Sequence, residues 1–165
     1  MATERTVEVE WIGAFLDGEG KIVSSTSGKL PELEVTWEGR TNEDAGLTSP
    51  EELLAAAHAS CYSMALASGL IGGGWEPMEI KVACTVGLEV GIGIVNSKLV
   101  AEVELDGEIP DDKLREVAER AKLSCPVSKA LAGIEITLEL PQLPPPEDEL
   151  EAAAEGEEVG ATTED

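Results

Sequence analysis

The sequence is short of aromatic and basic residues, and each shortage excludes a class of protein. Only 3% of its 165 residues are aromatic, so a hydrophobic core must be built from Val, Ile, Leu and Ala. Lys and Arg number 11 against 34 Asp and Glu, which gives a formal net charge of −23. Nucleic acids and anionic membranes attract clustered Lys and Arg, so neither is an expected partner.

Cysteine is also scarce, with single residues at Cys61, Cys84 and Cys125. Three cysteines do not make a dense disulfide framework, and the charged first residues lack the apolar run of a signal peptide. We therefore expect a cytoplasmic protein, in which a cysteine pair is more often catalytic or metal-binding than structural. The lone His58 and the absence of a CxxC spacing give zinc little support, so we expect neither a metal nor a bound cofactor.

Regular patterns of apolar residues predict an α+β fold. Alternation predicts strands at residues 6–15, 21–25, 33–37, 79–90, 94–105 and 134–140, and helical spacing predicts helices at residues 50–72, 111–123 and 126–133. Residues 38–47 are polar, contain two glycines and predict a loop. The order β-β-β-α-β-β-α-α-β indicates helices packed on antiparallel sheets.

The longest predicted helix begins at a capping box formed by Ser49, Pro50 and Glu52. From Leu53 to Trp75 it carries no formal charge, but its Ala, Ser and Gly content and acidic flanks favour a buried helix over a membrane span. Because it is apolar or small on nearly every side, we expect it to be enclosed all round. A single small domain covers such a helix with difficulty, and a partner subunit is the expected source of further cover.

A change of composition after Pro141 divides the chain into two parts. We expect residues 1–141 to form one domain. Residues 142–165 are rich in Pro, Glu and Ala, and nine of the acidic residues lie between Glu147 and Asp165. This acidic tail can bury little apolar area, so it is predicted to be disordered.

The residue patterns by themselves distinguish the three cysteines. Cys125 precedes Pro126 and can occupy a helix N-cap, where free amides and the helix dipole favour a thiolate; a plain structural cap is the alternative. Cys61 lies inside the uncharged helix, where a small buried hydrophobe is the better interpretation on physical grounds alone. Cys84 follows the apolar alternation of its strand and indicates core packing. His58 precedes Cys61 by one helical turn, and we expect a packed or hydrogen-bonded side chain.

Two motifs resemble those of a known family. Residues 48–61, TSPEELLAAAHASC, are similar to the signature around the first cysteine of the OsmC/Ohr family, the osmotically induced and organic hydroperoxide resistance proteins. Residues 125–131, CPVSKAL, look like its second signature, and the resemblance runs from about Thr6 to Leu140. His58, three residues before Cys61, makes the chain more similar to the osmotically induced branch.

The resemblance implies an OsmC-like fold, an intertwined homodimer with a long central cysteine-bearing helix, and reduction of organic hydroperoxides. In it, Cys61 matches the peroxidatic cysteine and Cys125 the resolving cysteine, which together form a disulfide that a lipoyl-type dithiol reduces. Glu51 matches a glutamate that orients an activating arginine, and Arg40 is the best candidate for that arginine. Glu51 precedes Cys61 by ten residues, about 15 Å of helix, so we expect it to serve the partner subunit's site.

Two other functions are compatible with the same residues. A general thiol-disulfide oxidoreductase or redox sensor would use both cysteines without selecting peroxides. A non-catalytic dimeric protein would instead hold a small ligand in an apolar interface pocket.

Overall fold

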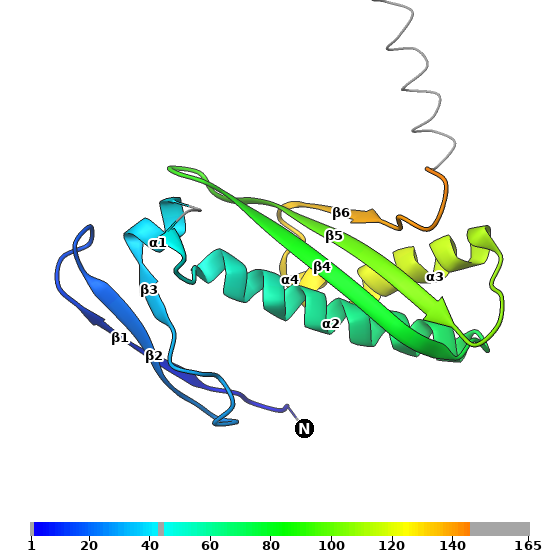
Figure 1. Cartoon of the computed structure of the whole chain (residues 1–165), viewed down its shortest axis with the longest axis horizontal. Helices are drawn as coiled ribbons and strands as arrows, with labels where there is room; N and C mark the ends of the chain where they lie inside the picture. The colour runs from blue at the N-terminus through cyan, green and yellow to red at the C-terminus, as the bar shows by residue number, and fades with distance from the viewer. Residues whose placement is uncertain (1, 43–44, 146–165) are drawn as a thin grey trace, which may run out of the picture.

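The computed structural model describes residues 2–42 and 45–145. Its elements follow the predicted order with one addition, the short helix α1 (Figure 1). In chain order they are β1 (Val7–Ile12), β2 (Glu19–Ser25), β3 (Glu34–Thr36), α1 (Trp37–Thr41), α2 (Pro50–Gly72), β4 (Pro77–Glu89), β5 (Gly93–Leu105), α3 (Asp111–Ser124), α4 (Pro126–Ala130) and β6 (Glu135–Glu139).

Helix α1 contradicts the first part, residues 38–41, of the loop predicted over residues 38–47; residues 43 and 44 lie outside the described residues. The Thr36 hydroxyl caps it by accepting a hydrogen bond from the Gly39 amide at 2.9 Å. Gly39 lowers helix propensity, which is why the composition indicated a loop. A cap compensates for one unfavourable residue, and the helix ends after little more than one turn.

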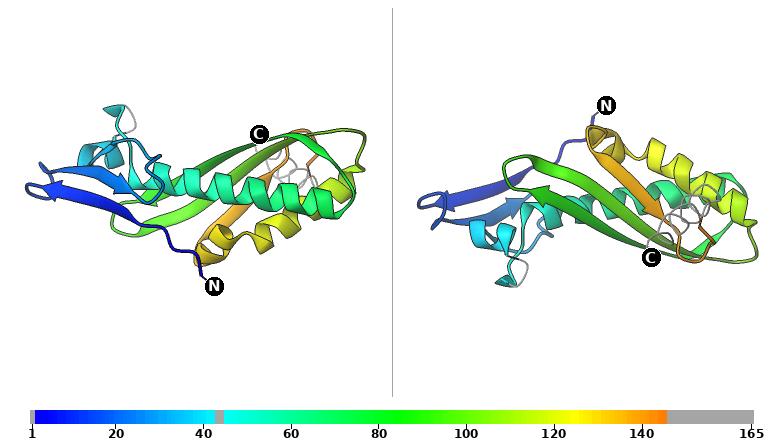
Figure 2. Two further views of the ribbon diagram at one scale, coloured as in Figure 1. Left: turned by 90° about the horizontal axis from the view of Figure 1, so that it is seen from below. Right: turned by 90° about the horizontal axis from the view of Figure 1, so that it is seen from above.

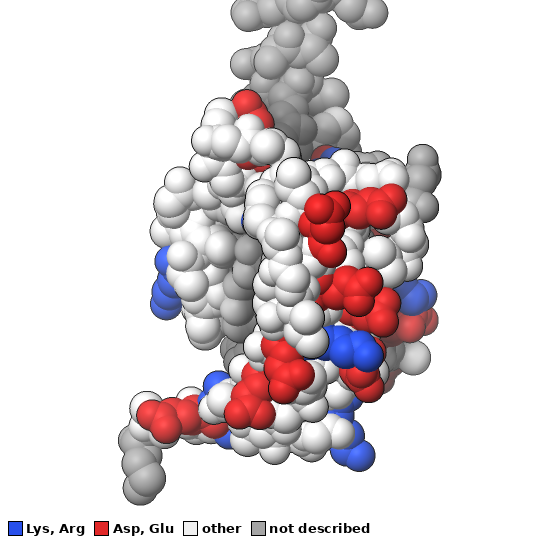
Figure 3. Space-filling model, turned by 90° about the vertical axis from the view of Figure 1, so that its left-hand side faces the viewer, with Lys and Arg blue, Asp and Glu red and all other residues white. Residues whose placement is uncertain are grey.

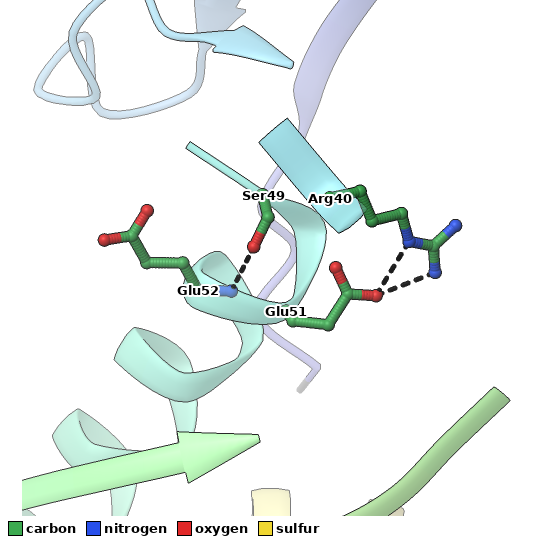
Figure 4. Close-up of polar contacts among 4 residues, drawn as sticks. All are labelled: Arg40, Ser49, Glu51 and Glu52. Carbon is green, nitrogen blue, oxygen red and sulfur yellow. Dashed lines mark hydrogen bonds and ion pairs between the residues drawn. The ribbon is translucent and has the colours of Figure 1, made fainter. Parts of the chain in front are cut away.

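The start of α2 confirms the predicted cap. The Ser49 hydroxyl accepts a hydrogen bond from the Glu52 amide at 3.1 Å, as Figure 4 shows. Pro50 occupies the first turn. In a full capping box the Glu52 side chain would also accept a hydrogen bond from the Ser49 amide. Here the Glu52 carboxylate instead accepts one from the Thr48 hydroxyl at 2.9 Å. The helix then runs unbroken to Gly72.

The strands form two separate three-stranded sheets, ordered β1-β2-β3 and β4-β5-β6. The expectation of antiparallel sheets is wrong for one pair, because β6 runs parallel to β5. The connection from β5 to β6 contains α3 and α4, and a crossover of that length returns the chain in the same direction, which a tight hairpin cannot do. The β4–β5 hairpin turns at Gly91 and Gly93, both at positive φ.

Helix α2 lies across one face of the β4-β5-β6 sheet, with α3 beside it (Figures 1 and 2). The buried stripe of α2 includes Tyr62, Leu66 and Leu70, which are spaced four residues apart and have no exposed surface. Burial of one such leucine stabilises the fold by about 1.5–3 kcal/mol. Only this stripe is fully buried, whereas Met64 and Ile71 on other faces are exposed, so the expected all-round enclosure is absent from the single chain.

The β1-β2-β3 sheet stands apart from this core, near the N-terminal end of α2 (Figure 1). Every residue of β1 is exposed, including the apolar Val9, Trp11 and Ile12. Contiguous exposed apolar surface of this kind is unusual in a monomer and is typical of an interaction surface.

Acidic side chains outnumber basic ones in this protein. Only the beginning of the predicted tail lies within the described residues. Figure 3 shows acidic side chains in a band, with few basic ones, at the end of the molecule near the β1-β2-β3 sheet. Leu143 still packs against the core, and the Pro144 carbonyl accepts a hydrogen bond from Arg115 at 2.5 Å. The rest of the predicted tail, residues 146–165, lies outside the described residues.

Candidate active site

The structure brings Cys61 and Cys125 into contact. Cys61 comes from the middle of α2 and is partly exposed, whereas Cys125 lies between α3 and α4 with no exposed surface. Both thiols are free, and each shifts the pKa of the other, so the two side chains lie close together.

The two thiols have opposite electrostatic environments in the single chain. Burial raises the pKa of Cys61, the Val127 amide partly offsets this, and the adjacent Cys125 raises it further. Burial alone would also raise the pKa of Cys125, but the Ser128 amide and hydroxyl, Cys61 and the Val127 amide outweigh it and hold the pKa of Cys125 below its ordinary value. The predicted N-cap position of Cys125 is confirmed, although its side chain makes no regular capping hydrogen bond.

Arg40 and Glu51 meet in a second cluster at the N-terminal end of α2. Arg40 donates from Nε and Nη2 to the same oxygen, Glu51 Oε1, at 2.9 and 2.7 Å (Figure 4). Both donor nitrogens of Arg40 therefore share one carboxylate oxygen of Glu51. Glu51 is 8% exposed, and its Oε2 has no hydrogen-bond partner among the described residues.

The Arg40–Glu51 pair is remote from Cys61 within its own chain. Because α2 is continuous, ten residues between Glu51 and Cys61 correspond to about 15 Å along the axis and about 80° around it. Neither side chain spans that gap. The structure therefore places the predicted residues in two pairs rather than in one cluster.

His58 lies in a buried polar network that the sequence did not reveal. Its ring has no exposed surface, with Nδ1 2.8 Å from Ser97 Oγ and Nε2 2.8 Å from Ser128 Oγ. Cys84 joins the network through Ser97, 3.3 Å away. The expected hydrogen-bonded histidine is confirmed, and Cys84 faces the core as predicted. The sequence did not predict that Ser97 and Ser128 bind His58. For Ser128, its position inside the second motif was the one available signal.

Metal chemistry finds no support in this arrangement. Among residues 2–42 and 45–145, no group of three or more His, Cys, Asp or Glu side chains is placed to hold a metal ion. The cluster offers instead two thiols in contact, one partly open to solvent and one held by hydrogen-bond donors. Such a pair can cycle between dithiol and disulfide.

Comparison with known proteins connects this geometry to a family. Residues 39–139 match the profile described as OsmC-like protein. The chain belongs to this family. It is 35% identical over 142 residues to peroxiredoxin OsmC of Escherichia coli (strain K12), covering 84% of this chain and 96% of that one. It is 32% identical over 127 residues to organic hydroperoxide resistance protein OhrA of Bacillus subtilis (strain 168), covering 74% and 87%.

The solved structures agree with this assignment. The crystal structure of organic hydroperoxide resistance protein OhrB of Bacillus subtilis superposes with a TM-score of 0.62 at 25% identity, over 82% of this chain and 97% of that one. The predicted OsmC-like α+β fold, with two small sheets and a long central helix, is thus confirmed. Helix α2 is long and apolar enough to cross a membrane by composition, but in this family it is the core helix and not a span.

Proposed function

We propose that this protein is a cysteine-based peroxidase that reduces organic hydroperoxides, and hydrogen peroxide less efficiently, through Cys61 and Cys125. The observation that carries the proposal is the contact between a partly exposed thiol and a buried one. Relatives named peroxiredoxin and organic hydroperoxide resistance protein support it.

Solvent access favours Cys61 as the residue that attacks peroxide, since Cys125 is fully buried. The Cys61 thiolate attacks the terminal peroxide oxygen, the O–O bond breaks, and the alkoxide takes a proton to leave as alcohol. Cys61 is then a sulfenic acid. Cys125 attacks its sulfur, the S–S bond forms, and the hydroxide that leaves takes a proton to become water. Two thiols are thereby oxidised to one disulfide while one peroxide is reduced.

Turnover requires a thiol reductant, because the disulfide must be opened again. A dithiol restores both cysteines by exchange, and a lipoyl-type dithiol is the reductant that the family resemblance implies. All redox chemistry then belongs to the two cysteines, and no bound cofactor takes part.

Activation of Cys61 needs a cation, and among the described residues of its own chain no Lys or Arg lowers the pKa of this thiol. Burial raises its pKa, whereas a nucleophilic thiol needs a stabilised thiolate. We assign this task to Arg40, oriented by Glu51, from the partner subunit of a homodimer. The uncovered apolar surface of β1 and the exposed Met64 and Ile71 of α2 favour such a dimer.

The test measures thiol oxidation by cumene hydroperoxide or tert-butyl hydroperoxide, using stopped-flow mixing, in the wild type and in Cys61→Ser. We expect the wild type to lose two thiols rapidly per Cys61–Cys125 site. The variant should lack this rapid phase. A wild type no faster than free cysteine would contradict the peroxidase function. Rapid exchange with small disulfides without reaction with peroxide would indicate an oxidoreductase, and inertness toward both would indicate a binding protein.

A further inference from the structure

A row of hydrogen-bonding side chains links the β4-β5-β6 sheet to the cysteine pair through an otherwise apolar core. His58 on α2 lies between Ser97 on β5 and Ser128 on α4, at 2.8 Å from each hydroxyl oxygen. Both serines are buried, and Ser97 also contacts the Cys84 thiol at 3.3 Å. The imidazole is thus held from two sides by separate elements, which fixes both its position and its orientation.

Ser128 connects this row to Cys125. Cys125 is the N-cap of α4 and Ser128 is its third helical residue, the position from which a side chain reaches back to the cap. The Ser128 amide and hydroxyl both lower the pKa of Cys125, so they lie beside its sulfur, although Cys125 makes no regular capping hydrogen bond. The Ser128 hydroxyl thus lies between His58 Nε2, 2.8 Å from its oxygen, and Cys125.

When Cys125 is a thiolate, its charged sulfur is a stronger acceptor than a neutral ring nitrogen, so the Ser128 hydroxyl hydrogen points to the sulfur. The Ser128 oxygen then accepts from Nε2–H of His58. Burial lowers the pKa of His58 and favours its neutral ring, which leaves Nδ1 as an acceptor for the Ser97 hydroxyl. The Ser97 oxygen in turn accepts from the Cys84 thiol. Every donor in the row then points toward Cys125.

We infer that His58 is a positioning residue for the resolving cysteine: its Nε2–H holds the Ser128 hydroxyl with its hydrogen on the Cys125 sulfur, which prepares that sulfur to attack Cys61. The role of Cys125 as the resolving residue rests on the proposed function, whereas the hydrogen-bond assignment does not. Because Nε2 carries a hydrogen in this tautomer, it cannot accept one from the Ser128 hydroxyl. The hydroxyl hydrogen therefore stays on the sulfur.

Nearby charges do not supply the same effect. Among the described residues, the titratable neighbours of Cys125 and His58 are Cys61 and Tyr62 on α2 and Cys84 on β4, with Glu119 of α3 near Tyr62. Neither Lys122 at the end of α3 nor Lys129 of α4 is among the main causes of the lowered Cys125 pKa. Uncharged donors aimed at the sulfur are therefore what favours the thiolate here.

The direct test titrates Cys125 as the sole thiol, in the full-length protein carrying Cys61→Ser and Cys84→Ala. The ultraviolet absorbance of the thiolate reports its pKa without a reagent having to enter the core, and the same protein with Cys125→Ser supplies the blank. In this background Ser128→Ala and His58→Leu should raise the pKa of Cys125 by about one unit. His58→Gln keeps a donor at the Nε2 position and should raise it less.

A purely structural His58 gives a different result. In that case the three variants lower Tm while the Cys125 titration stays at the value of the background protein, and this outcome overturns the inference. If His58→Leu does not fold, Ser128→Ala and His58→Gln carry the test: the inference requires the first to shift the titration and the second to preserve most of it.

A kinetic test then places the effect on the resolving step. In a Cys84→Ala background, His58→Leu should leave the rate of Cys61 oxidation by tert-butyl hydroperoxide unchanged and slow disulfide formation about threefold. The threefold value combines a tenfold lower fraction of Cys125 thiolate with a partly compensating rise in the nucleophilicity of that thiolate. Equal slowing of both steps contradicts the inference. Failure of the background protein itself to react with peroxide would contradict the proposed function and leave the titration result standing.

Discussion

Mixed dimers test the assignment of Arg40 to the partner's site. One chain carries Cys61→Ser and the other carries Arg40→Met, and the two are co-expressed with different tags in equal amounts. Each homodimer lacks one essential group at both of its sites. In a heterodimer, however, the Cys61 of the Arg40→Met chain faces the intact Arg40 of the other chain if the groups act between subunits.

The structure sets the expected size of the effect. Glu51, which binds Arg40, lies about 15 Å along α2 from Cys61, beyond the screening length at physiological salt, so we expect Arg40 to contribute well under 1 kcal/mol to the Cys61 thiolate of its own chain. At 4–6 Å across an interface an opposite charge lowers a thiol pKa by about one to three units. Random pairing makes half the dimers mixed with one complete site each, so the mixture should regain roughly a quarter of wild-type peroxidase activity.

A second mixture checks the same assignment in the opposite direction. Wild-type chains are combined with chains that carry both Cys61→Ser and Arg40→Met. Sharing between subunits leaves only wild-type homodimers active, or roughly a quarter of full activity, whereas sites complete within one chain would retain roughly half. No recovered activity in the first mixture together with half activity in the second would refute the assignment.

Three further predictions concern the second cysteine, the helix cap and the buried histidine. Cys125→Ser should consume one peroxide per Cys61 and stop at sulfenic acid, which dimedone trapping and mass spectrometry detect; loss of the first turnover would reverse the two cysteine roles. Ser49→Ala should lower the free energy of unfolding by about 1 kcal/mol, measured by urea denaturation with Ser27→Ala as a surface control, because it removes the α2 cap. Burial lowers the pKa of His58 in the folded protein. As the pH falls through about 6.5, the unfolded chain therefore binds a proton at this residue before the folded chain does, and the folded state loses stability relative to the unfolded state. Tm should therefore drop between neutral and mildly acidic pH, and less steeply in His58→Gln; identical pH slopes would contradict this.

The sequence by itself determined most of the local structure and the two cysteine motifs. Ser49 and Pro50 specify the start of α2, and alternating residues such as Val82 and Cys84 specify the inward face of β4, because caps and periodicity depend on neighbours in the chain. The Cys-Pro pair likewise predicted the N-cap position of Cys125. These signals act over a few residues, so no tertiary context is needed to interpret them.

Tertiary structure alone decided how these pieces meet. The parallel pairing of β6 with β5, the placement of Ser97 and Ser128 on either side of His58, and the Arg40–Glu51 contact all join segments far apart in the chain. Local propensity carries no information about such pairings, since they depend on the path of the whole backbone. The same fold that brings Cys61 close to Cys125 separates Cys61 from Arg40, and because of that separation we propose that a partner subunit supplies Arg40.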